Sequence, residues 1–470
     1  MTESTTISRR RFVAAGAGAA VIAGAGYLGF EGLSRADAAD STAPPAETYT
    51  RHSLCNACEN QCGFTAYVVN GVLTKLVGDS GSPYGGGKLC GRGYGYATIA
   101  YNKDRLTEPL KRNENGSFSP ISWDEAYFEI AEKLTALIAA HGAKTLALVH
   151  SPRPSGAFYG PRFFNALGSP NVYTHAAACN LSRDSGFAQV FGEGNYSADI
   201  ANAKLVMLIG YNPAESVSPA TLAAMQKSRA NGGHIVLVDP RMTKSSTFAD
   251  EWLPINPGTD LALVLAMAHV LVQRGIYHRE FVAAHTVGFE DWAKRLAQYS
   301  PAWAEPITGI PAVTISRLAE QFAEAAPASV IDAGGYGAYG SAYLNSGETA
   351  RAIALFNTLL GNWNQKGGAL ILPSPSFGKL DSNKFPEVPK PAGTKLGSSE
   401  YPLALNSLGS SVFAAEKAKE GALKAMFFYH SNVAADCPNP AYLAEALSQL
   451  ELSVVIDVQM SETAQLAHYV

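Results

Sequence analysis

The sequence has few charged residues and no excess of either sign. Charged residues make up 16% of the 470 positions, and 36 Lys and Arg against 40 Asp and Glu leave a net charge of -4. Without a basic stripe, nucleic acid is not an expected partner. A hydrophobic fraction of 47% excludes a disordered chain, and the length predicts two to four domains.

Long apolar runs are also scarce. The one that could span a membrane follows Arg9, Arg10 and Arg11, reads AAGAGAAVIAGAGYLGF, and is followed by small residues around Ala38. Its weak hydropathy favours a cleaved secretory signal over a membrane anchor, and the arginines are typical of the twin-arginine route. We therefore expect residues 1–40 to be a signal peptide and the protein to be extracytoplasmic, peripheral to the membrane, and exported after folding.

Cysteine is rare, yet three of the six cysteines fall within CNACENQC. Cys55, Cys58 and Cys62 are too close together for good disulfide geometry, so a metal centre is the better interpretation, with Cys90 of KLCGRG as a fourth ligand. Four thiolates suit a structural zinc or a [4Fe-4S] cluster, and three ligands on one loop favour the cluster. Arg92, two positions later, is a candidate cation beside it.

Apolar periodicity predicts an α/β protein. Apolar alternation in FTAYVVNGVLTKLVG predicts a hairpin, and WDEAYFEIAEKLTALIAAHG predicts a helix capped by Ser122. Buried strands are expected in TLALVH, LVMLIG, HIVLVDPR, SVIDAGG, AMFFYHSN and LSVVIDV, with a helix in PATLAAMQKSRA. This alternation predicts doubly wound parallel sheets, in which ligands bind at the carboxyl ends of strands.

Polar motifs follow these strands. GYNPAES, VDPR and INPGTD supply side chains that can bind a guanine, a ribose or a phosphate, although each motif alone is ordinary turn chemistry. The candidate nucleotide-binding residues from these motifs are Gly210, Asn212, Asp239, Arg241, Gly258, Thr259 and Asp260.

In this order, the motifs resemble those of the DMSO reductase family of molybdopterin oxidoreductase catalytic subunits. LLGNWNQKGG, HSN and DVQMSETA extend the resemblance, and the last two add Asn432 and Thr463 to the cofactor-binding candidates. The resemblance implies a [4Fe-4S] cluster and molybdenum or tungsten held by two molybdopterin guanine dinucleotides. It also implies that Arg92 lies between the cluster and a pterin.

The resemblance further implies a domain organisation. A [4Fe-4S] domain is expected at 48–105, a Rossmann-like α/β domain with the metal-ligand loop at 151–329, and a discontinuous α/β domain at 106–150 and 330–470. Family members continue into a C-terminal pterin-covering domain, so we expect this chain to be a fragment or to pair with a separate chain carrying that domain.

Cys179 is the residue that the resemblance assigns as the protein ligand of molybdenum, since it occupies the expected slot in THAAACNLSRDSG. His175 lies four residues earlier, and this His-x3-Cys arrangement resembles that of the polysulfide, thiosulfate and arsenate reductase branch of the family. Asn180 stands where formate dehydrogenases of the family tend to carry His, which disfavours formate. Arg153, Arg183 and Tyr196 are candidates to hold an oxyanion, with surface charge and core packing as the alternatives.

Other interpretations remain open. A molybdenum-free electron-transfer subunit of the same fold would keep the cluster alone, and a zinc-stabilised binding protein would lack iron. For the catalytic interpretation, the resemblance implies a ferredoxin-like iron–sulfur subunit and a quinone-linked membrane subunit as partners, and a small inorganic substrate.

Overall fold

The computed structural model describes most of the chain after the expected signal peptide. The described residues are 47–58, 60–82, 87–151, 157–216, 219–334, 343–373, 381–402 and 409–470. The expected signal peptide and Arg153 therefore lie outside the described residues. Residues 47–50 and 67–74 form one compact unit, and the rest of the described chain forms another.

A three-stranded sheet opens the described chain. Its strands β1 (Thr48–Leu54), β2 (Gly63–Val69) and β3 (Val72–Gly78) lie in sequence order. Asn70 and Gly71 connect β2 to β3 with positive φ angles of 50° and 78°, which is the combination that a two-residue type I′ hairpin turn requires. The predicted hairpin is confirmed, and it leads toward α2 (Gly91–Ala100).

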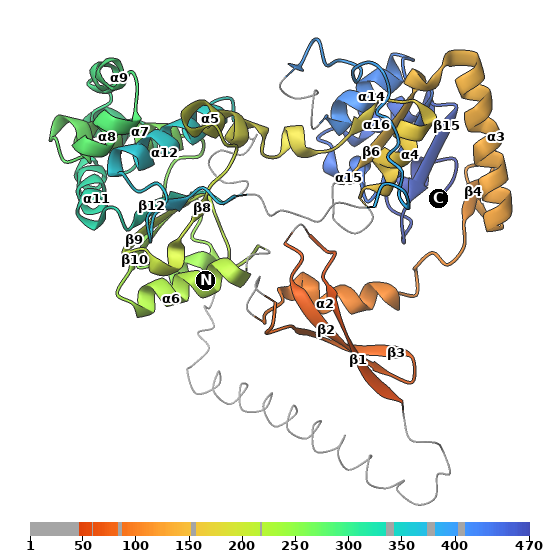
Figure 1. The fold of residues 1–470 in the computed structure, drawn as a ribbon, viewed down its shortest axis with the longest axis horizontal. Helices are drawn as coiled ribbons and strands as arrows, with labels where there is room; N and C mark the ends of the chain where they lie inside the picture. Colours follow the sequence, from red (N-terminus) through yellow and green to blue (C-terminus); the bar gives the residue numbers. More distant parts are fainter. Residues whose placement is uncertain are drawn as a thin grey trace, which may run out of the picture. The chain divides into compact units, whose positions relative to one another are not determined.

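A four-stranded parallel sheet, called here the β9 sheet, forms the core of the middle of the chain. Its order is β11-β10-β9-β12. Every residue of β9 is buried, because helices cover both faces: α6 lies on one face and α7, α11 and α12 lie on the other (Figure 1). The strand bounds are β9 (Leu205–Ile209), β10 (His234–Val238), β11 (Glu251–Leu253) and β12 (Ser329–Asp332), and the helix bounds are α5 (Leu181–Phe191), α6 (Pro219–Ala230), α7 (Asp260–Gln273), α8 (Arg279–His285), α9 (Phe289–Leu296), α10 (Pro301–Thr308), α11 (Ala312–Ala325) and α12 (Ser346–Leu360).

A second parallel sheet, called here the β6 sheet, has the order β15-β14-β6-β7. Successive residues of β6 pack into two separate cores: Ala147 and Val149 face α14 and α16, whereas Leu146 and Leu148 face α3 and α4. This is the period-two alternation expected of a strand covered on both faces. The bounds are β6 (Leu146–His150), β7 (Val172–Tyr173), β14 (Ala425–Tyr429), β15 (Leu452–Ile456), α3 (Trp123–His141), α4 (Tyr159–Leu167), α14 (Ser411–Lys419) and α16 (Pro440–Ser448).

The strand pairing shifts two of the expected domain boundaries. Helix α4 and strand β7 belong to the β6 sheet although they follow residue 151, and β12 and α12 belong with the β9 sheet although they follow residue 329. The expected strands and the α6 helix are confirmed, as is α3, whose cap Ser122 Oγ accepts from the Glu125 amide at 3.1 Å. Pairing between distant strands, which sequence periodicity does not report, sets the boundaries.

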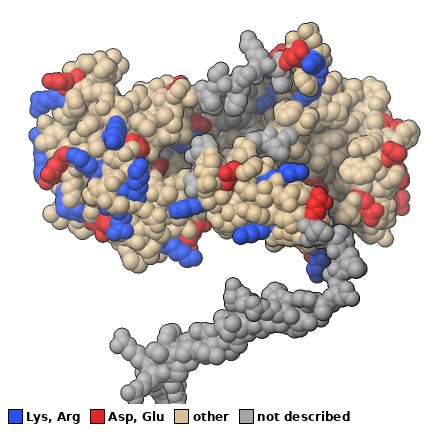
Figure 2. Space-filling model, turned by 60° about the horizontal axis from the view of Figure 1, so that its bottom comes forward, with Lys and Arg blue, Asp and Glu red and all other residues tan. Residues whose placement is uncertain are grey.

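Charges are sparse on the surface as well as in the sequence. On the face in Figure 2, lysine and arginine side chains lie among acidic and uncharged ones. Among the described residues, no helix has both the length and the hydropathy that a bilayer span requires.

The packing of α5 against α12 predicts a sharp effect at Gly186. A Cβ atom on Gly186 would lie 2.3 Å from the Gly347 carbonyl oxygen, whereas a Cβ on Gly347 would meet the Ser182 carbonyl at an ordinary 3.5 Å. Gly186→Ala should therefore lower the free energy of unfolding by about 1–3 kcal/mol. Gly347→Ala is the matched control, and helix propensity should leave it neutral or slightly stabilised. Equal unfolding midpoints in denaturant for the two variants would contradict this packing.

Candidate cluster and molybdopterin sites

The four cysteines expected to hold a cluster lie close together. The Cys55 amide donates to the Cys62 carbonyl at 2.9 Å, which closes the loop that carries Cys58. These three residues are buried, and Cys90 is partly exposed at the residue before α2 begins. None of the six cysteines forms a disulfide bond.

Electrostatic effects on Cys55 and Cys62 indicate that the four thiols are neighbours. Burial raises the pKa of Cys55, and the Cys58 and Cys90 thiolates raise it further while Arg92 lowers it. Burial also raises the pKa of Cys62, with Cys58, Cys55 and Cys90 acting in the same direction. A loop that crowds thiolates at such a cost needs a cation among them, and a metal centre supplies one. Arg92 therefore lies where its charge reaches the cluster ligands.

The arrangement suits a cubane better than one metal ion. Among the described residues, no group of three or more His, Cys, Asp or Glu side chains is placed to hold a single ion. A structural zinc would need four ligands about 2 Å from one point, whereas each thiolate of a [4Fe-4S] cluster binds a different iron. The donor set thus fits the predicted cluster.

The carboxyl edge of the β9 sheet gathers the first set of cofactor candidates. Gly210 and Asn212 follow β9, Asp239 and Arg241 follow β10, and the segment 258–260 follows β11. Because these three strands are adjacent and parallel, their ends meet at one edge. Gly210 has a φ of 59°, and its amide donates to the Val238 carbonyl at 2.8 Å, which turns the chain sharply at the end of β9.

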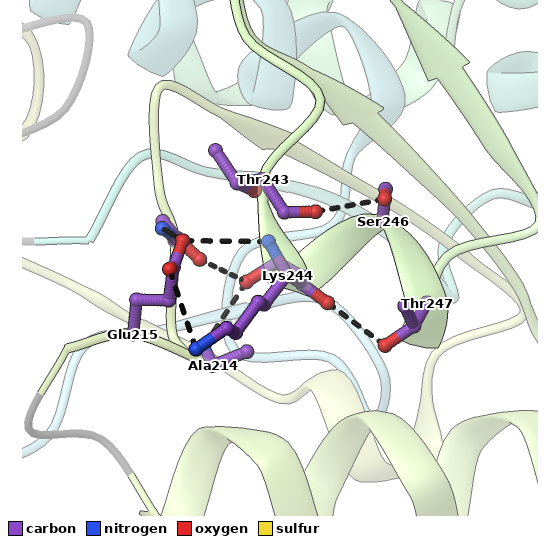
Figure 3. Close-up of polar contacts among 8 residues, drawn as sticks. Ala214, Glu215, Thr243, Lys244, Ser246 and Thr247 are labelled. Atoms are coloured by element: carbon purple, nitrogen blue, oxygen red, sulfur yellow. Dashed lines mark hydrogen bonds and ion pairs between the residues drawn. The ribbon is translucent and has the colours of Figure 1, made fainter. Parts of the chain in front are cut away.

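Asn212 is held by a polar network that the sequence did not reveal. Its side-chain oxygen accepts from the buried Ser245 hydroxyl at 2.7 Å, and its amide donates to Glu215 at 2.7 Å. Figure 3 shows Glu215 facing Lys244, whose backbone amide donates to the same carboxylate. Asn212 and these contacts lower the pKa of Glu215. Ser245 and Glu215 could have been found only from the fold, since 30 residues separate them in the chain.

Two carboxyl groups and an unpaired hydroxyl complete this edge. Asp239 is buried, and its carboxylate accepts from the Arg241 amide at 2.8 Å. Burial raises the pKa of Asp260 to about 6, with Asp239 as a further cause. The buried Thr243 hydroxyl has no partner among the described residues. Acceptors and an unsatisfied hydroxyl suit the amine and hydroxyl groups of a nucleotide, so the residues fit a molybdopterin dinucleotide.

Thr259 and Gly258 have structural contacts of their own. The Thr259 hydroxyl donates to the Asn256 backbone carbonyl at 2.7 Å. The Gly258 backbone carbonyl accepts from the Asn345 side-chain amide at 3.1 Å. Gly258 has a φ of 77°, which side chains rarely tolerate. These residues shape the turn into α7, and their role toward a cofactor stays a prediction.

The carboxyl edge of the β6 sheet gathers the second set. The Thr463 hydroxyl donates to the Asn432 side-chain oxygen at 2.8 Å, and the Asn432 amide donates to Glu462 at 2.6 Å. Asn432 follows β14 and Thr463 follows β15, so the fold unites two candidates that are 31 residues apart. Thr463 is fully buried and also accepts from the Ala434 amide, which makes Asn432 the more available of the two.

Cys179 lies between β7 and α5. The Cys179 amide donates to the Ala176 carbonyl at 3.1 Å in a short 3₁₀ turn that His175 precedes. Its thiol donates to the Asn180 side-chain oxygen at 2.6 Å, and it is partly exposed. Cys179 thus lies outside the buried core, in the loop between β7 and α5, and its role as a metal ligand stays a prediction.

Tyr196 does not occupy the place expected of a substrate contact. It is buried against Phe187 and Trp363, and its hydroxyl donates to the Ile331 carbonyl of β12. The expectation that Tyr196 holds an oxyanion is wrong, because the core takes both its ring and its hydroxyl. Arg183 is also buried, and it pairs with Asp184 at 2.7 Å rather than facing solvent.

Comparison with known proteins identifies the family to which the chain belongs. Residues 105–470 match the molybdopterin oxidoreductase family, and residues 48–102 match the Fe4S4 domain of molybdopterin oxidoreductases. The chain therefore belongs to the molybdopterin oxidoreductase family. This confirms the resemblance and the two cofactor types, an iron–sulfur cluster and molybdenum with molybdopterin.

Particular relatives cover a range of chemistries. The chain is 30% identical to the thiosulfate reductase molybdopterin-containing subunit PhsA of Salmonella typhimurium, over 89% of this chain and 57% of that protein. It is 28% identical to the arsenate respiratory reductase subunit ArrA of Shewanella sp. strain ANA-3, over 97% of this chain and 59% of that protein. The solved acetylene hydratase of Pelobacter acetylenicus superposes with a TM-score of 0.76 at 26% identity, over 89% of this chain and 62% of that one. The chain thus spans about three fifths of these relatives.

The cysteine loop predicts a specific loss of iron. Cys62→Ala should reduce bound iron from about four per chain to less than half and abolish the visible absorbance of the cluster. Cys437→Ala is the control. Because Cys437 lies outside the loop, this variant should retain the iron content of the wild-type protein. Full iron content in Cys62→Ala by metal analysis would refute the assignment.

Asp260 predicts a pH dependence of stability. Its folded pKa of about 6 lies above the ordinary value, so the folded state binds the extra proton. The stability that this proton gives is present below about pH 4 and is lost as pH rises through about 6, about 3 kcal/mol in all. Asp260→Asn should remove this loss, measured as the difference between wild-type and variant unfolding midpoints from pH 4 to 7 in cofactor-free protein. Parallel pH profiles for the two proteins would contradict it.

Proposed function

We propose that this protein is the catalytic part of a molybdenum- or tungsten-dependent oxidoreductase that acts on a sulfur compound or an arsenic oxyanion. Polysulfide, thiosulfate, tetrathionate and arsenate are the candidate substrates. The [4Fe-4S] cluster held by the cysteine loop passes electrons singly to or from the molybdenum site. The observation that carries this proposal is the position of Cys179, a partly exposed thiol at the carboxyl edge of a parallel sheet.

The residues around Cys179 serve metal binding. When bound, the molybdenum cofactor supplies two-electron exchange together with transfer of an oxygen or sulfur atom. Ligation requires the thiolate, so the proton that Cys179 now donates to Asn180 has to leave. The Asn180 amide can then turn its NH₂ group toward the sulfur and stabilise the negative charge.

Polar side chains at the edges of two sheets support the assignment of two guanine dinucleotides. The β9 sheet offers Asn212, Asp239 and Asp260, and the β6 sheet offers Asn432. Each edge lies at the carboxyl ends of parallel strands, where nucleotides bind in such folds. One dinucleotide at each edge accounts for both sets of motif residues.

The substrate class rests on His175 and on what the relatives act on by name, thiosulfate and arsenate. Asn180 after the metal ligand disfavours formate, which remains the second candidate substrate. A molybdenum-free electron carrier of the same fold is the other alternative, and Cys179 argues against it because such a carrier needs no metal ligand there.

The cellular setting belongs to the same proposal. Paired arginines before an apolar run support export by the twin-arginine route, to the outer side of the cytoplasmic membrane. A ferredoxin-like subunit and a quinone-linked membrane subunit would exchange electrons with the cluster in anaerobic respiration.

A large apolar surface lies beside α3. An apolar pocket of about 790 Å³ lies between α3 and β15 and includes the exposed rings of Trp123 and Tyr127. Tyr469 and Val470 form part of its wall, and Val470 exchanges two backbone hydrogen bonds with Leu110. A surface of this character favours coverage by further polypeptide.

Substituting Cys179 tests the catalytic proposal. Reduction of thiosulfate, tetrathionate, polysulfide and arsenate by a reduced viologen dye should be detectable for at least one of them. Cys179→Ala should lower that rate by a factor on the order of a hundred or more, since a metal ligand is lost. Cys437→Ala should retain the rate, and both variants should retain their iron. Wild-type turnover by Cys179→Ala would exclude Cys179 as the ligand.

A further inference from the structure

His430 is the first residue after β14, in the HSN motif of which the proposed function uses only Asn432. Its backbone has a positive φ of 53°. A side chain in this left-handed region crowds the backbone, so glycine is the residue that adopts it at the lowest cost. His430 therefore carries a side chain that the turn itself does not require.

Residues other than glycine with a positive φ are few in the described part of the chain. Two of them, Asn70 and Asn364, are asparagines, whose short polar side chains tolerate this conformation. The other two are Gln61, which lies in the cysteine loop, and His430. Such residues cluster at functional sites, because the surrounding structure has to hold them in place. The location of His430 is therefore worth examining for a ligand.

The connections of the β6 sheet change direction between β6 and β14. Strand β6 leads through α4 to β7 on one side, and β14 leads through α16 to β15 on the other side. Phe164 of α4 packs on one face of the sheet, and Leu443 of α16 packs on the opposite face. In open parallel sheets, ligands bind at the carboxyl ends of the two strands that flank such a switch point. His430 follows one of these two strands and is exposed there.

The β9 sheet has the same turn with glycine in it. Gly210 is the first residue after β9, has a φ of 59°, and precedes Asn212 by two positions, as His430 precedes Asn432. Each asparagine oxygen accepts from a hydroxyl that follows the neighbouring strand, and each asparagine amide donates to a glutamate. The two edges are built alike, and the imidazole of His430 is an addition at the second one.

The chemistry of the imidazole indicates which part of a nucleotide it would contact. Glycine in a strand-to-helix turn lets the backbone approach a diphosphate closely, and at the end of β14 an imidazole occupies that position. A neutral or a protonated imidazole offers an N–H donor, and bonds from such donors to phosphate oxygens are strong. The His430 ring lies against the Tyr429 ring, with centroids 4.8 Å apart, which restricts its orientation.

We propose that His430 donates a hydrogen bond to the diphosphate of a nucleotide bound at the carboxyl edge of the β6 sheet. The two nucleotide sites are then unequal, because the edge of the β9 sheet has glycine in the same place. That this nucleotide is a molybdopterin guanine dinucleotide rests on the proposed function.

The test uses His430→Gly, which removes the imidazole and relieves the backbone at the same time. Its unfolding temperature should equal or exceed that of the wild-type protein, so a folding defect cannot explain weaker binding. His430→Asn tolerates the same backbone conformation and restores a side-chain N–H donor. Asn70→Gly is the matched control, since it makes the same backbone change in a hairpin turn. Native protein is held just below its unfolding temperature, and the GMP that remains bound per chain is followed over time.

In His430→Gly, one of the two GMP per chain should be lost about tenfold faster than from the wild-type protein, and the other at the wild-type rate. His430→Asn should be intermediate, and Asn70→Gly should match the wild type. Unchanged loss of both GMP in His430→Gly would overturn the proposal. Equal acceleration of both would overturn it too, because a general structural effect acts on both sites.

Wild-type protein that carries no GMP would refute the proposed function. Titration of cofactor-free protein with GDP then decides the role of His430 by itself. His430→Gly should bind GDP about tenfold more weakly than the wild type at one of two sites. Equal affinities of the two proteins, or no GDP binding by the wild type, would overturn the proposal.

Discussion

Parallel strand pairing is the constraint on which the candidate sites depend. In each four-stranded sheet every strand runs the same way, so the loops that follow the strands are collected at one edge. Asn212, Asp239 and Asp260 come together for this reason, and so do Asn432 and Thr463. The metal-ligand loop of Cys179 also leaves such an edge, after β7. The fully buried strands take no part in the chemistry, but they fix where each polar loop begins.

The cysteine loop obeys a different constraint, in which charge rather than hydrophobic burial governs the geometry. Cys55 and Cys62 are buried beside other thiols, and burial together with these neighbours raises the pKa of each. The folded loop is therefore electrostatically incomplete until a metal centre binds, and binding stabilises the fold by linkage. Burial likewise raises the pKa of Asp260 at the nucleotide edge, with Asp239 as a further cause.

Periodicity in the sequence predicted the local structure well. Strands such as β9 are continuous apolar runs, and α3 begins at a serine cap. Both could therefore be predicted without knowing which segments pack against them. Pairing between distant segments could not be read, which is why β7 and β12 fell in the wrong domain. The prediction for Tyr196 was wrong for a related reason. A tyrosine packed in a core against Phe187 and Trp363 has the same local sequence pattern as a tyrosine in a cleft. Ser245 and Glu215 were missed because only the fold gives them their partners.

The most direct test of this account is metal and nucleotide analysis of the purified native protein. A catalytic subunit with both cofactors should contain about four irons and one molybdenum or tungsten per chain, and acid should release two GMP. Zinc in place of iron would contradict the cluster assignment. Iron without molybdenum, tungsten or GMP would contradict the catalytic assignment and leave an electron carrier of the same fold.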